Sequence, residues 1–244
     1  METIKNFLLE LFFPSFCLGC KKEGTYLCQD CKATLEISEY DYCLCSKNPL
    51  RLASLAHGKP SGKCGSCKDK KLSGLYSALP YKEKTLTRKL IHQFKYEPYI
   101  KNLAKTLSAI LVEHFVLAGK NTNDIWDNGV LVPVPLDKKK LKNRGYNQAE
   151  ELAKELSKVL KIPVAKENLA KIKETLPQMK LSAEKRKENL KSAFVVKNPA
   201  GVSGKKVFLV DDVYTTGSTM EECAYVLRTS GTKWVWGIVI AREG

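Results

Sequence analysis

The segment VFLVDDVYTTGST, residues 207–219, places two aspartates directly after a run of apolar residues. The apolar run is typical of a buried strand, and charges next to such a strand must be paired, solvated or bound to a ligand. The residues that follow are rich in hydroxyl groups and lead into a helical pattern near Thr219. This order of strand, acid pair, hydroxyl turn and helix predicts an α/β fold with a ligand site at the carboxyl end of a strand.

The chemistry of the segment indicates what the ligand is. The start of a helix offers unbonded backbone N–H groups that suit a phosphate, and Gly217 lets the backbone approach closely. Asp211 and Asp212, which we expect just past the end of the strand, repel a phosphate but suit sugar hydroxyls or a Mg²⁺ ion. A ligand with a phosphate at one end and a diol beside it is predicted, such as a ribose 5-phosphate.

The segment is similar to the binding motif for 5-phosphoribosyl-1-pyrophosphate (PRPP) in type I phosphoribosyltransferases, where two acids precede Thr-Thr-Gly-Ser-Thr. The resemblance implies that Asp211 and Asp212 hold the ribose hydroxyls and that Mg²⁺ binds with PRPP. It also implies that a five-residue loop wraps the 5-phosphate: Thr215, Thr216, Gly217, Ser218 and Thr219. The pyrophosphate would lie at the turn 133–136, which contains Pro135, and at a basic loop that follows. We assign Arg144 to it, because a guanidinium matches phosphate oxygens bidentately.

The rest of the chain after residue 72 alternates strand and helix patterns. Strands are expected at residues 75–81, 129–136, 193–196, 206–210 and 234–241. Helices are expected at residues 84–95, 100–118, 147–160 and 219–230. Asn147 is a suitable N-cap, and Ser218 with Glu221 and Thr219 with Glu222 both fit a capping box. The alternation predicts a type I phosphoribosyltransferase-like parallel sheet with helices on both faces.

Eight of the nine cysteines lie between positions 17 and 67. They form four close pairs: Cys17 and Cys20, Cys28 and Cys31, Cys43 and Cys45, and Cys64 and Cys67. Two such pairs make a tetrahedral four-sulfur site, which selects Zn²⁺, so we expect one or two structural zinc ions. Sequential pairing gives the groups 17/20/28/31 and 43/45/64/67, and cross-braced pairing is the alternative. We therefore divide the chain into an N-terminal helix with a double zinc ribbon, residues 1–72, and a phosphoribosyltransferase-like domain, residues 73–244.

Paired cysteines that bind metal are typical of a reducing compartment, so we expect a cytoplasmic protein. No segment reaches the roughly 18–20 apolar residues of a membrane span. Residues 1–13 have apolar positions at helical spacing before Pro14. We expect an amphipathic helix that docks on the protein's own core, with peripheral binding at the inner face of the membrane as the alternative.

The chain is strongly basic, with 41 Lys and Arg against 26 Asp and Glu and a formal net charge of +15. This excess indicates either a polyanionic partner or a lysine-rich surface that serves solubility. Segments 94–101 and 138–146 combine basic with aromatic residues, as single-stranded DNA binding requires. Core packing of the aromatic residues is the alternative. The candidate DNA contacts are Lys95, Lys138, Lys139, Lys140, Lys142 and Tyr146.

Three further stretches resemble the ComF family of competence proteins, whose members also carry cysteine pairs in front of the domain. They are IHQFKY (91–96), RGYNQA (144–149), and TLPQ (175–178) with Arg186, Asn189 and Phe194. The resemblance implies a role in natural transformation, in which single-stranded DNA is handled on the cytoplasmic side after uptake. It also implies other competence proteins as partners, such as a DNA-translocating helicase.

Two functions follow from these resemblances. The first is a PRPP-binding competence factor that handles single-stranded DNA. The second is an active phosphoribosyltransferase, similar to amidophosphoribosyltransferases or to nucleobase salvage enzymes, with an unknown acceptor. Phosphoribosyltransferases recognise the acceptor through a hood outside the shared core. We expect no hood after the last strand, and the cysteine module has no evident base-recognition motif, so we favour the competence factor.

Overall fold

A computed structural model describes residues 14–45, 63–120, 123–173 and 192–243. Its centre is a four-stranded sheet in the order β1-β6-β5-β2, and every neighbouring pair is parallel. The strands are β1 (Gly74–Pro80), β2 (Gly129–Pro133), β5 (Lys206–Tyr214) and β6 (Trp234–Arg242). The predicted parallel sheet is confirmed. The expected N-terminal helix at 1–13 and the stretch TLPQ with Arg186 and Asn189 lie outside the described residues.

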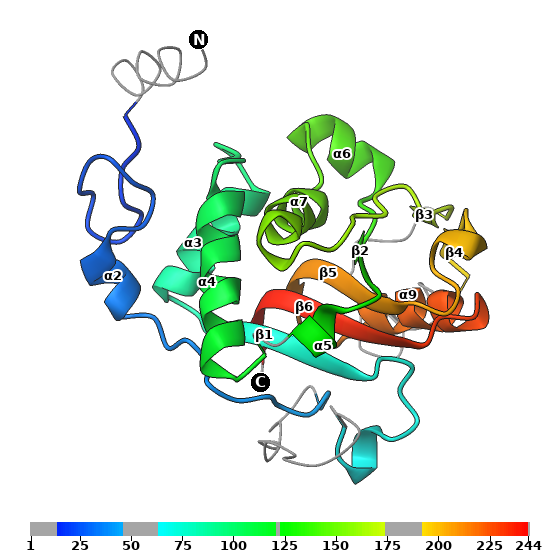
Figure 1. The fold of residues 1–244 in the computed structure, drawn as a ribbon. Coiled ribbons are helices and arrows are strands. Elements are labelled where there is room, and N and C mark those ends of the chain that lie inside the picture. Colours follow the sequence, from blue (N-terminus) through cyan, green and yellow to red (C-terminus); the bar gives the residue numbers. More distant parts are fainter. Residues whose placement is uncertain (1–13, 46–62, 121–122, 174–191, 244) are drawn as a thin grey trace.

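Helices cover both faces of this sheet (Figure 1). One face packs against α3 (Leu86–Lys95), α4 (Leu103–Leu117) and α7 (Gln148–Leu160), and the other against α9 (Ser218–Thr229). Alternate side chains of β5 enter the two cores, with Phe208 and Val210 on the α3–α4–α7 side and Val207 and Leu209 on the α9 side. A strand that is buried on both faces reads as a continuous apolar run, which explains the VFLV pattern.

Shorter elements connect this framework. They are α2 (Gln29–Ala33), η1 (Gly65–Cys67), α5 (Asn123–Trp126), α6 (Lys138–Arg144), β3 (Leu169–Lys171), β4 (Phe194–Val196) and η3 (Pro199–Gly201). Strands β3 and β4 pair antiparallel in a sheet of their own. Among the described helices, none is both long and apolar enough to span a membrane.

Two expectations for the site region are wrong. Asp211 and Asp212 do not follow the strand but belong to it, because β5 stays paired with β6 as far as Tyr214. The basic stretch after the β2 turn is a helix, α6, where a loop was expected. The Asp137 side chain caps its first turn by accepting from the Lys139 N–H at 3.0 Å, and Gly145 ends it with a φ of 79°.

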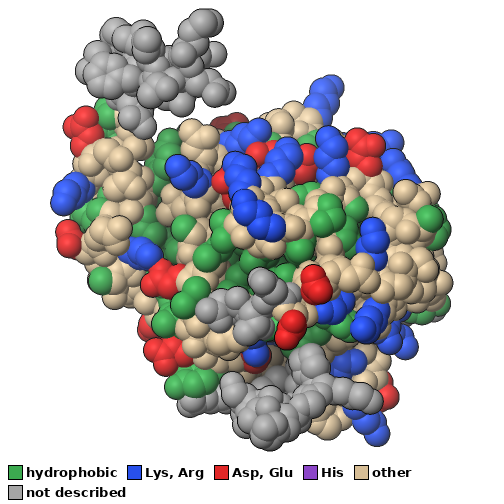
Figure 2. Space-filling view, in the orientation of Figure 1, with side chains coloured by type: hydrophobic (Ala, Val, Ile, Leu, Met, Phe, Trp, Pro, Cys, Tyr) green, Lys and Arg blue, Asp and Glu red, His purple; other side chains and the backbone are tan. Residues whose placement is uncertain are grey.

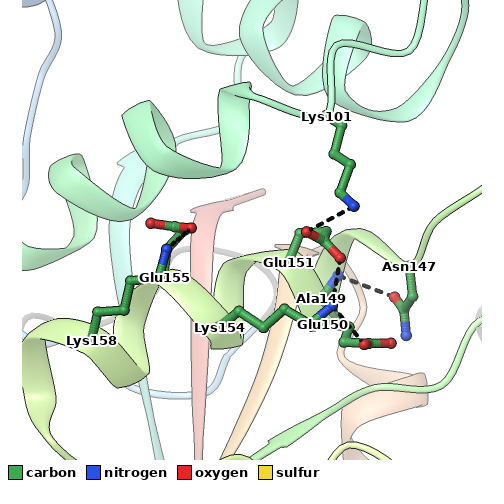
Figure 3. Close-up of polar contacts among 8 residues, drawn as sticks. All are labelled: Lys101, Asn147, Ala149, Glu150, Glu151, Lys154, Glu155 and Lys158. Atoms are coloured by element: carbon green, nitrogen blue, oxygen red, sulfur yellow. Dashed lines mark hydrogen bonds and ion pairs between the residues drawn. The ribbon is translucent and has the colours of Figure 1, made fainter. Parts of the chain in front are cut away.

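The N-terminus of α7 is built as predicted. The Asn147 side chain accepts a hydrogen bond from the Ala149 N–H at 3.1 Å. The acids of the first turns of α7 pair with lysines: Glu151 with Lys101 at 3.4 Å and with Lys154 at 2.8 Å (Figure 3). Further along the helix, Lys158 pairs with Glu155. The lysines of α7 are therefore matched by acids on the same surface.

The expected capping boxes of α9 are not formed. The N-cap is Gly217, and no side chain caps the helix. The Glu221 carboxylate accepts instead from the backbone N–H groups of Lys71 and Leu72, and Glu222 accepts from that of Ser192 at 2.8 Å. The acids at the start of α9 therefore join distant segments to the helix, which a local sequence pattern cannot indicate.

Candidate functional site

The carboxyl ends of β2 and β5 lie side by side. Pro133 is in register with Val210, and the Val134 N–H donates to the Val210 carbonyl at 2.9 Å. The Val134 carbonyl in turn accepts from the Asn147 side chain at 3.0 Å. The turn 133–136, with the half-buried Pro135, therefore lies next to the acid pair, and α7 holds it there.

Asp211 and Asp212 lie next to each other near the carboxyl end of β5. Asp212 is buried and forms an ion pair with Lys95 from the last turn of α3, at 2.9 Å. Asp211 is half-buried, and its Oδ1 accepts from the Asp212 N–H at 2.8 Å. Burial and the Asp212 carboxylate together raise the pKa of Asp211 to about 8. The two acids therefore compete for one nearby cation.

The acid pair carries more negative charge than Lys95 can balance, and this excess fits a Mg²⁺ ion. Burial lowers the pKa of Lys95, but the two aspartates outweigh burial and raise it, so the lysine stays charged. One ammonium group faces two carboxylates, and a second cation would favour the ionised form of Asp211. Carboxylate oxygens are the ligands that Mg²⁺ takes, with water and substrate oxygens completing the shell.

The hydroxyl loop lies between β5 and α9. The Thr216 and Ser218 hydroxyls are 2.9 Å apart, and Thr216 Oγ1 also accepts from the Ser218 N–H at 3.4 Å. Gly217 turns the chain with a φ of 75°, and α9 begins at the next residue. The loop therefore places hydroxyl groups together with the amino end of a 12-residue helix, which is an arrangement that fits a phosphate.

Replacing Gly217 with alanine should disrupt this loop. A Cβ at this position would lie 2.3 Å from the Tyr214 hydroxyl and 2.4 Å from Cζ of the same ring. The variant should also lose roughly 1–2 kcal/mol of unfolding free energy through its left-handed backbone. Gly204 is the matched control, because its φ is also positive but nothing lies within 4 Å of its Cβ position. Denaturant unfolding should show a larger loss for Gly217→Ala than for Gly204→Ala, and equal losses would contradict the contact with Tyr214.

Arg144 lies at the end of α6, and its side chain is half-buried. Its Nε and Nη1 atoms are buried, and no residue in the described parts of the chain accepts a hydrogen bond from them. The guanidinium carbon is 6.0 Å from the centre of the Tyr96 ring, next to Lys95. Buried donors without acceptors are costly, so this guanidinium fits an anionic ligand at the same edge of the sheet.

Two of the candidate DNA contacts do not fit that role. The Tyr146 ring is buried, packs 5.8 Å from Phe94 and donates its hydroxyl hydrogen to the Phe94 carbonyl at 2.7 Å. It connects α3 to the loop after α6 and presents no face to a base. Lys95 is held by Asp212 and belongs to the acid site. The other four candidates, all on α6, have exposed side chains: Lys138, Lys139, Lys140 and Lys142.

The eight N-terminal cysteines form two groups of four, in which all sulfur atoms lie within 4.8 Å of one another. The groups are Cys17, Cys20, Cys28 and Cys31, and Cys43, Cys45, Cys64 and Cys67. Sequential pairing is therefore confirmed over the cross-braced alternative. All nine cysteines are free thiols, so each group can hold a metal ion, and four sulfurs select Zn²⁺.

In each cysteine group, hydrogen bonds lower the pKa of one thiol, which favours the thiolate that a metal needs, and raise the pKa of another, Cys31 or Cys45. Burial raises the pKa of Cys17, but the backbone N–H groups of Cys28, Cys20 and Gly19 outweigh burial and lower it to about 6. In the second group, a hydrogen bond from Cys45 is the main cause that lowers the pKa of Cys64 to about 7. Cys223, by contrast, lies in α9 and is fully buried in the core.

Comparison with known proteins identifies the family. Residues 141–243 match the family described as Phosphoribosyl transferase domain. The chain is 32% identical to Competence protein F of Haemophilus influenzae over 241 residues, which cover 94% of this chain and 99% of that protein. The chain belongs to the ComF family. It is also 32% identical to the DNA utilization protein YhgH of Salmonella typhi over 86% of this chain and 95% of that one. With Competence protein ComFC of Bacillus subtilis it shares 36% identity over 42% of this chain and 39% of that protein.

In this ComF protein, hydrogen bonds connect the second cysteine group to the carboxyl end of the sheet. Arg242, the last residue of β6, is buried and donates to the Cys43 carbonyl at 2.9 Å and to the Cys45 carbonyl at 2.5 Å. The Tyr214 hydroxyl donates to the Leu44 carbonyl at 3.0 Å. Tyr214 is the last residue of β5, and its ring lies against Gly217. The second cysteine group and the hydroxyl loop therefore both contact Tyr214.

The sequence analysis did not identify the residues that link the second cysteine group to β5 and β6, namely Tyr214, Arg242 and Lys70. Lys70 donates to the Leu44 carbonyl and lies 3.1 Å from the Tyr214 hydroxyl. Tyr214 stands inside the PRPP-like motif, between the acids and the threonines, and that position was the signal available. Arg242 and Lys70 gave no local signal, because their partners in the ComF fold lie far away in the chain.

Proposed function

We propose that this chain is a competence factor that binds PRPP with Mg²⁺ and handles single-stranded DNA. The observation that carries the PRPP site is the meeting of the acid pair, the hydroxyl loop and the orphaned Arg144 guanidinium around one edge of the sheet. The match of residues 141–243 to the Phosphoribosyl transferase domain supports it. Ligands of open α/β sheets bind outside the carboxyl ends of the strands, where these groups lie.

Each part of the ligand has a complementary group. We assign the ribose hydroxyls and the Mg²⁺ ion to Asp211 and Asp212, and the 5-phosphate to the loop 215–219. We assign the pyrophosphate to Arg144 and the turn that contains Pro135. Isothermal titration calorimetry of PRPP and Mg²⁺ with an Asp211→Asn, Asp212→Asn variant tests this assignment.

The DNA role rests on the family and on the surface of α6. Two relatives carry the names Competence protein F and DNA utilization protein. Lys and Arg side chains gather along the upper edge of the molecule in Figure 2, where Figure 1 shows α6. The four exposed lysines of α6 follow one another closely in the chain. We propose α6 as the DNA-binding surface.

Replacing Lys138, Lys139, Lys140 and Lys142 together with glutamine should weaken the binding of a single-stranded oligonucleotide. Each lysine that binds a phosphate releases a counterion. The dependence of log affinity on log salt should therefore flatten by about 0.7 for each lysine–phosphate pair that the substitutions remove. Fluorescence anisotropy at several salt concentrations, with and without PRPP, measures both quantities. The affinity should not depend strongly on base sequence.

A control with the same change of charge carries four glutamines at exposed lysines outside α6: Lys89, Lys105, Lys166 and Lys197. It should keep most of the wild-type affinity and slope. Equal effects in the two variants would show that only net charge matters and would remove α6 from the proposal. Absence of binding by the wild-type protein at low salt would remove the DNA function itself.

An active phosphoribosyltransferase is the second candidate, and the match to the Phosphoribosyl transferase domain favours it. Such an enzyme would transfer the ribose phosphate to a nucleophile while cationic groups stabilise the departing pyrophosphate. Release of pyrophosphate from PRPP and Mg²⁺ in the presence of nucleobases or an amine tests this activity. Failure with every acceptor, while PRPP still binds, would favour the competence factor.

We propose that the protein acts in the cytoplasm, where cysteines stay reduced and hold structural zinc. By resemblance to the ComF family, its partners there include other competence proteins such as a DNA-translocating helicase. The division into residues 1–72 and 73–244 stays a prediction. Within it, the first cysteine group packs against the α3–α4–α7 side through Leu27, and the second against the α9 side through Leu44.

A further inference from the structure

A cavity of about 350 Å³ lies beside the second cysteine group, against the carboxyl end of α9. None of its lining residues belongs to the PRPP site or to α6. Five cations and one acid contribute to its walls: Lys63, Lys68, Lys70, Lys71, Arg228 and Asp69. The partial negative charge at the end of a helix disfavours anions, but it amounts to only about half an elementary charge. The cations therefore dominate the field in this cavity.

The walls of the cavity are held by hydrogen bonds. The Lys63 ammonium donates to the Lys70 carbonyl at 2.6 Å. The backbone N–H groups of Lys71 and Leu72 donate to the Glu221 carboxylate of α9. On the other wall, Arg228 Nη1 donates to the Lys233 carbonyl at 3.1 Å. The cations thus converge because the backbone is fixed between the cysteine group and α9.

Two of the cations are available to a ligand. Lys68 and Lys71 are exposed, and within the described parts of the chain their ammonium groups have no hydrogen-bond or ion-pair partner. The lysines and the arginine that line the cavity repel one another, and an anion in the cavity would relieve this repulsion.

The cavity is separate from the hydroxyl loop. The loop lies at the start of α9, and Arg228 lies ten residues further along, a distance of roughly 15 Å at 1.5 Å per residue. Lys70 connects the two places, because it lines the cavity and also contacts the Tyr214 hydroxyl beneath Gly217. The cavity is thus a second basic site, and Lys70 connects it to Tyr214.

We propose that this cavity binds phosphate groups, from a small polyphosphate or from the backbone of single-stranded DNA. Lysine and arginine side chains form short charge-assisted hydrogen bonds to phosphate oxygens, and several of them converge here. The proposal does not depend on PRPP binding, because its residues lie outside the carboxyl edge of the sheet. It adds to α6 a second surface at which a nucleic acid backbone can be held.

The experiment follows backbone amide signals of the full-length, zinc-loaded protein by NMR during titration with pyrophosphate, without Mg²⁺. Signals of residues 68–73 and of Arg228 should shift, and they can be told apart from signals of the loop 215–219. In a Lys68→Gln, Lys71→Gln variant the shifts at the cavity should require at least about tenfold more pyrophosphate, since the loss of one charge-assisted bond alone is worth that order. The shifts at 215–219 should be unchanged.

A Lys89→Gln, Lys105→Gln variant is the control for net charge and should titrate like the wild type. A second titration uses oligothymidylate in place of pyrophosphate. Shifts at the cavity with the oligonucleotide identify a DNA backbone as the source of the phosphates, and shifts with pyrophosphate alone identify a small anion. No shift at residues 68–73 with either probe, or equal titrations for the cavity variant and the control, would overturn the proposal whether or not PRPP binds.

Discussion

Replacing Cys64 and Cys67 with serine should remove one of two zinc ions and destabilise the hydroxyl loop as well as the cysteine group. Structural zinc supplies on the order of 10 kcal/mol of folding free energy in small zinc modules. Here the group also positions the carbonyls that bind Arg242 and Tyr214. Without the metal, these buried donors would lose their acceptors, and each loss costs about 1–3 kcal/mol. Metal analysis and thermal unfolding measure the two effects.

A Cys17→Ser, Cys20→Ser variant is the matched comparison, since it also removes two sulfurs from one group. It should lose the other zinc ion and the order around residues 17–31. The hydroxyl loop should survive, because the first group packs near Leu86 of α3 and away from Tyr214. If both variants weaken PRPP binding equally, the second group has no particular role in supporting the loop. A folded, metal-free protein with intact thiols would refute both zinc sites.

Replacing Asp211 and Asp212 together with asparagine should lower the affinity for PRPP and Mg²⁺ by at least about tenfold, or 1.4 kcal/mol. The substitution keeps the volume of both side chains and removes the charges that would hold the diol and the metal. Isothermal titration calorimetry measures the affinity, and circular dichroism shows that the fold survives.

The control for this prediction is Asp124→Asn with Asp127→Asn, which changes the net charge by the same amount. These two aspartates are exposed and lie at α5, just before β2 begins and therefore at the amino edge of the sheet. The control should bind PRPP like the wild type. Unchanged affinity in the Asp211 and Asp212 variant would remove the site assignment, whatever the DNA experiments show.

Much of the framework could be predicted from the sequence because its signals are local. The apolar runs mark the central strands, and Asn147 marks the start of α7. The spacing of the cysteines indicated four-sulfur sites, but the choice between sequential and cross-braced pairing required the structure. For the helix α6, the signals were present in the N-cap Asp137 and in Gly145 after its last turn, but the run of lysines between them read as a loop.

The parts that could not be predicted depend on contacts between distant segments. Glu221 fits a capping box locally, but the N–H groups of Lys71 and Leu72 bind its carboxylate. Tyr146 follows a basic stretch and resembles a stacking residue, but the Phe94 carbonyl fixes its hydroxyl in the core. The acid pair was expected after β5 because its charges interrupt the apolar run, yet pairing with β6 extends the strand through both.

The position of β6 has a consequence for how the chain is made. This strand lies between β1 and β5, and its last residue, Arg242, holds the carbonyls of Cys43 and Cys45. On the ribosome, β1 emerges with Gly74, long before its partner begins at Trp234. The edge of β1 that pairs with β6 therefore stays unpaired while most of the domain is translated. Unpaired strand edges of this kind are prone to aggregation. Early capture of metal by the cysteine groups and shielding of β1 by a chaperone would both protect the nascent chain during this interval.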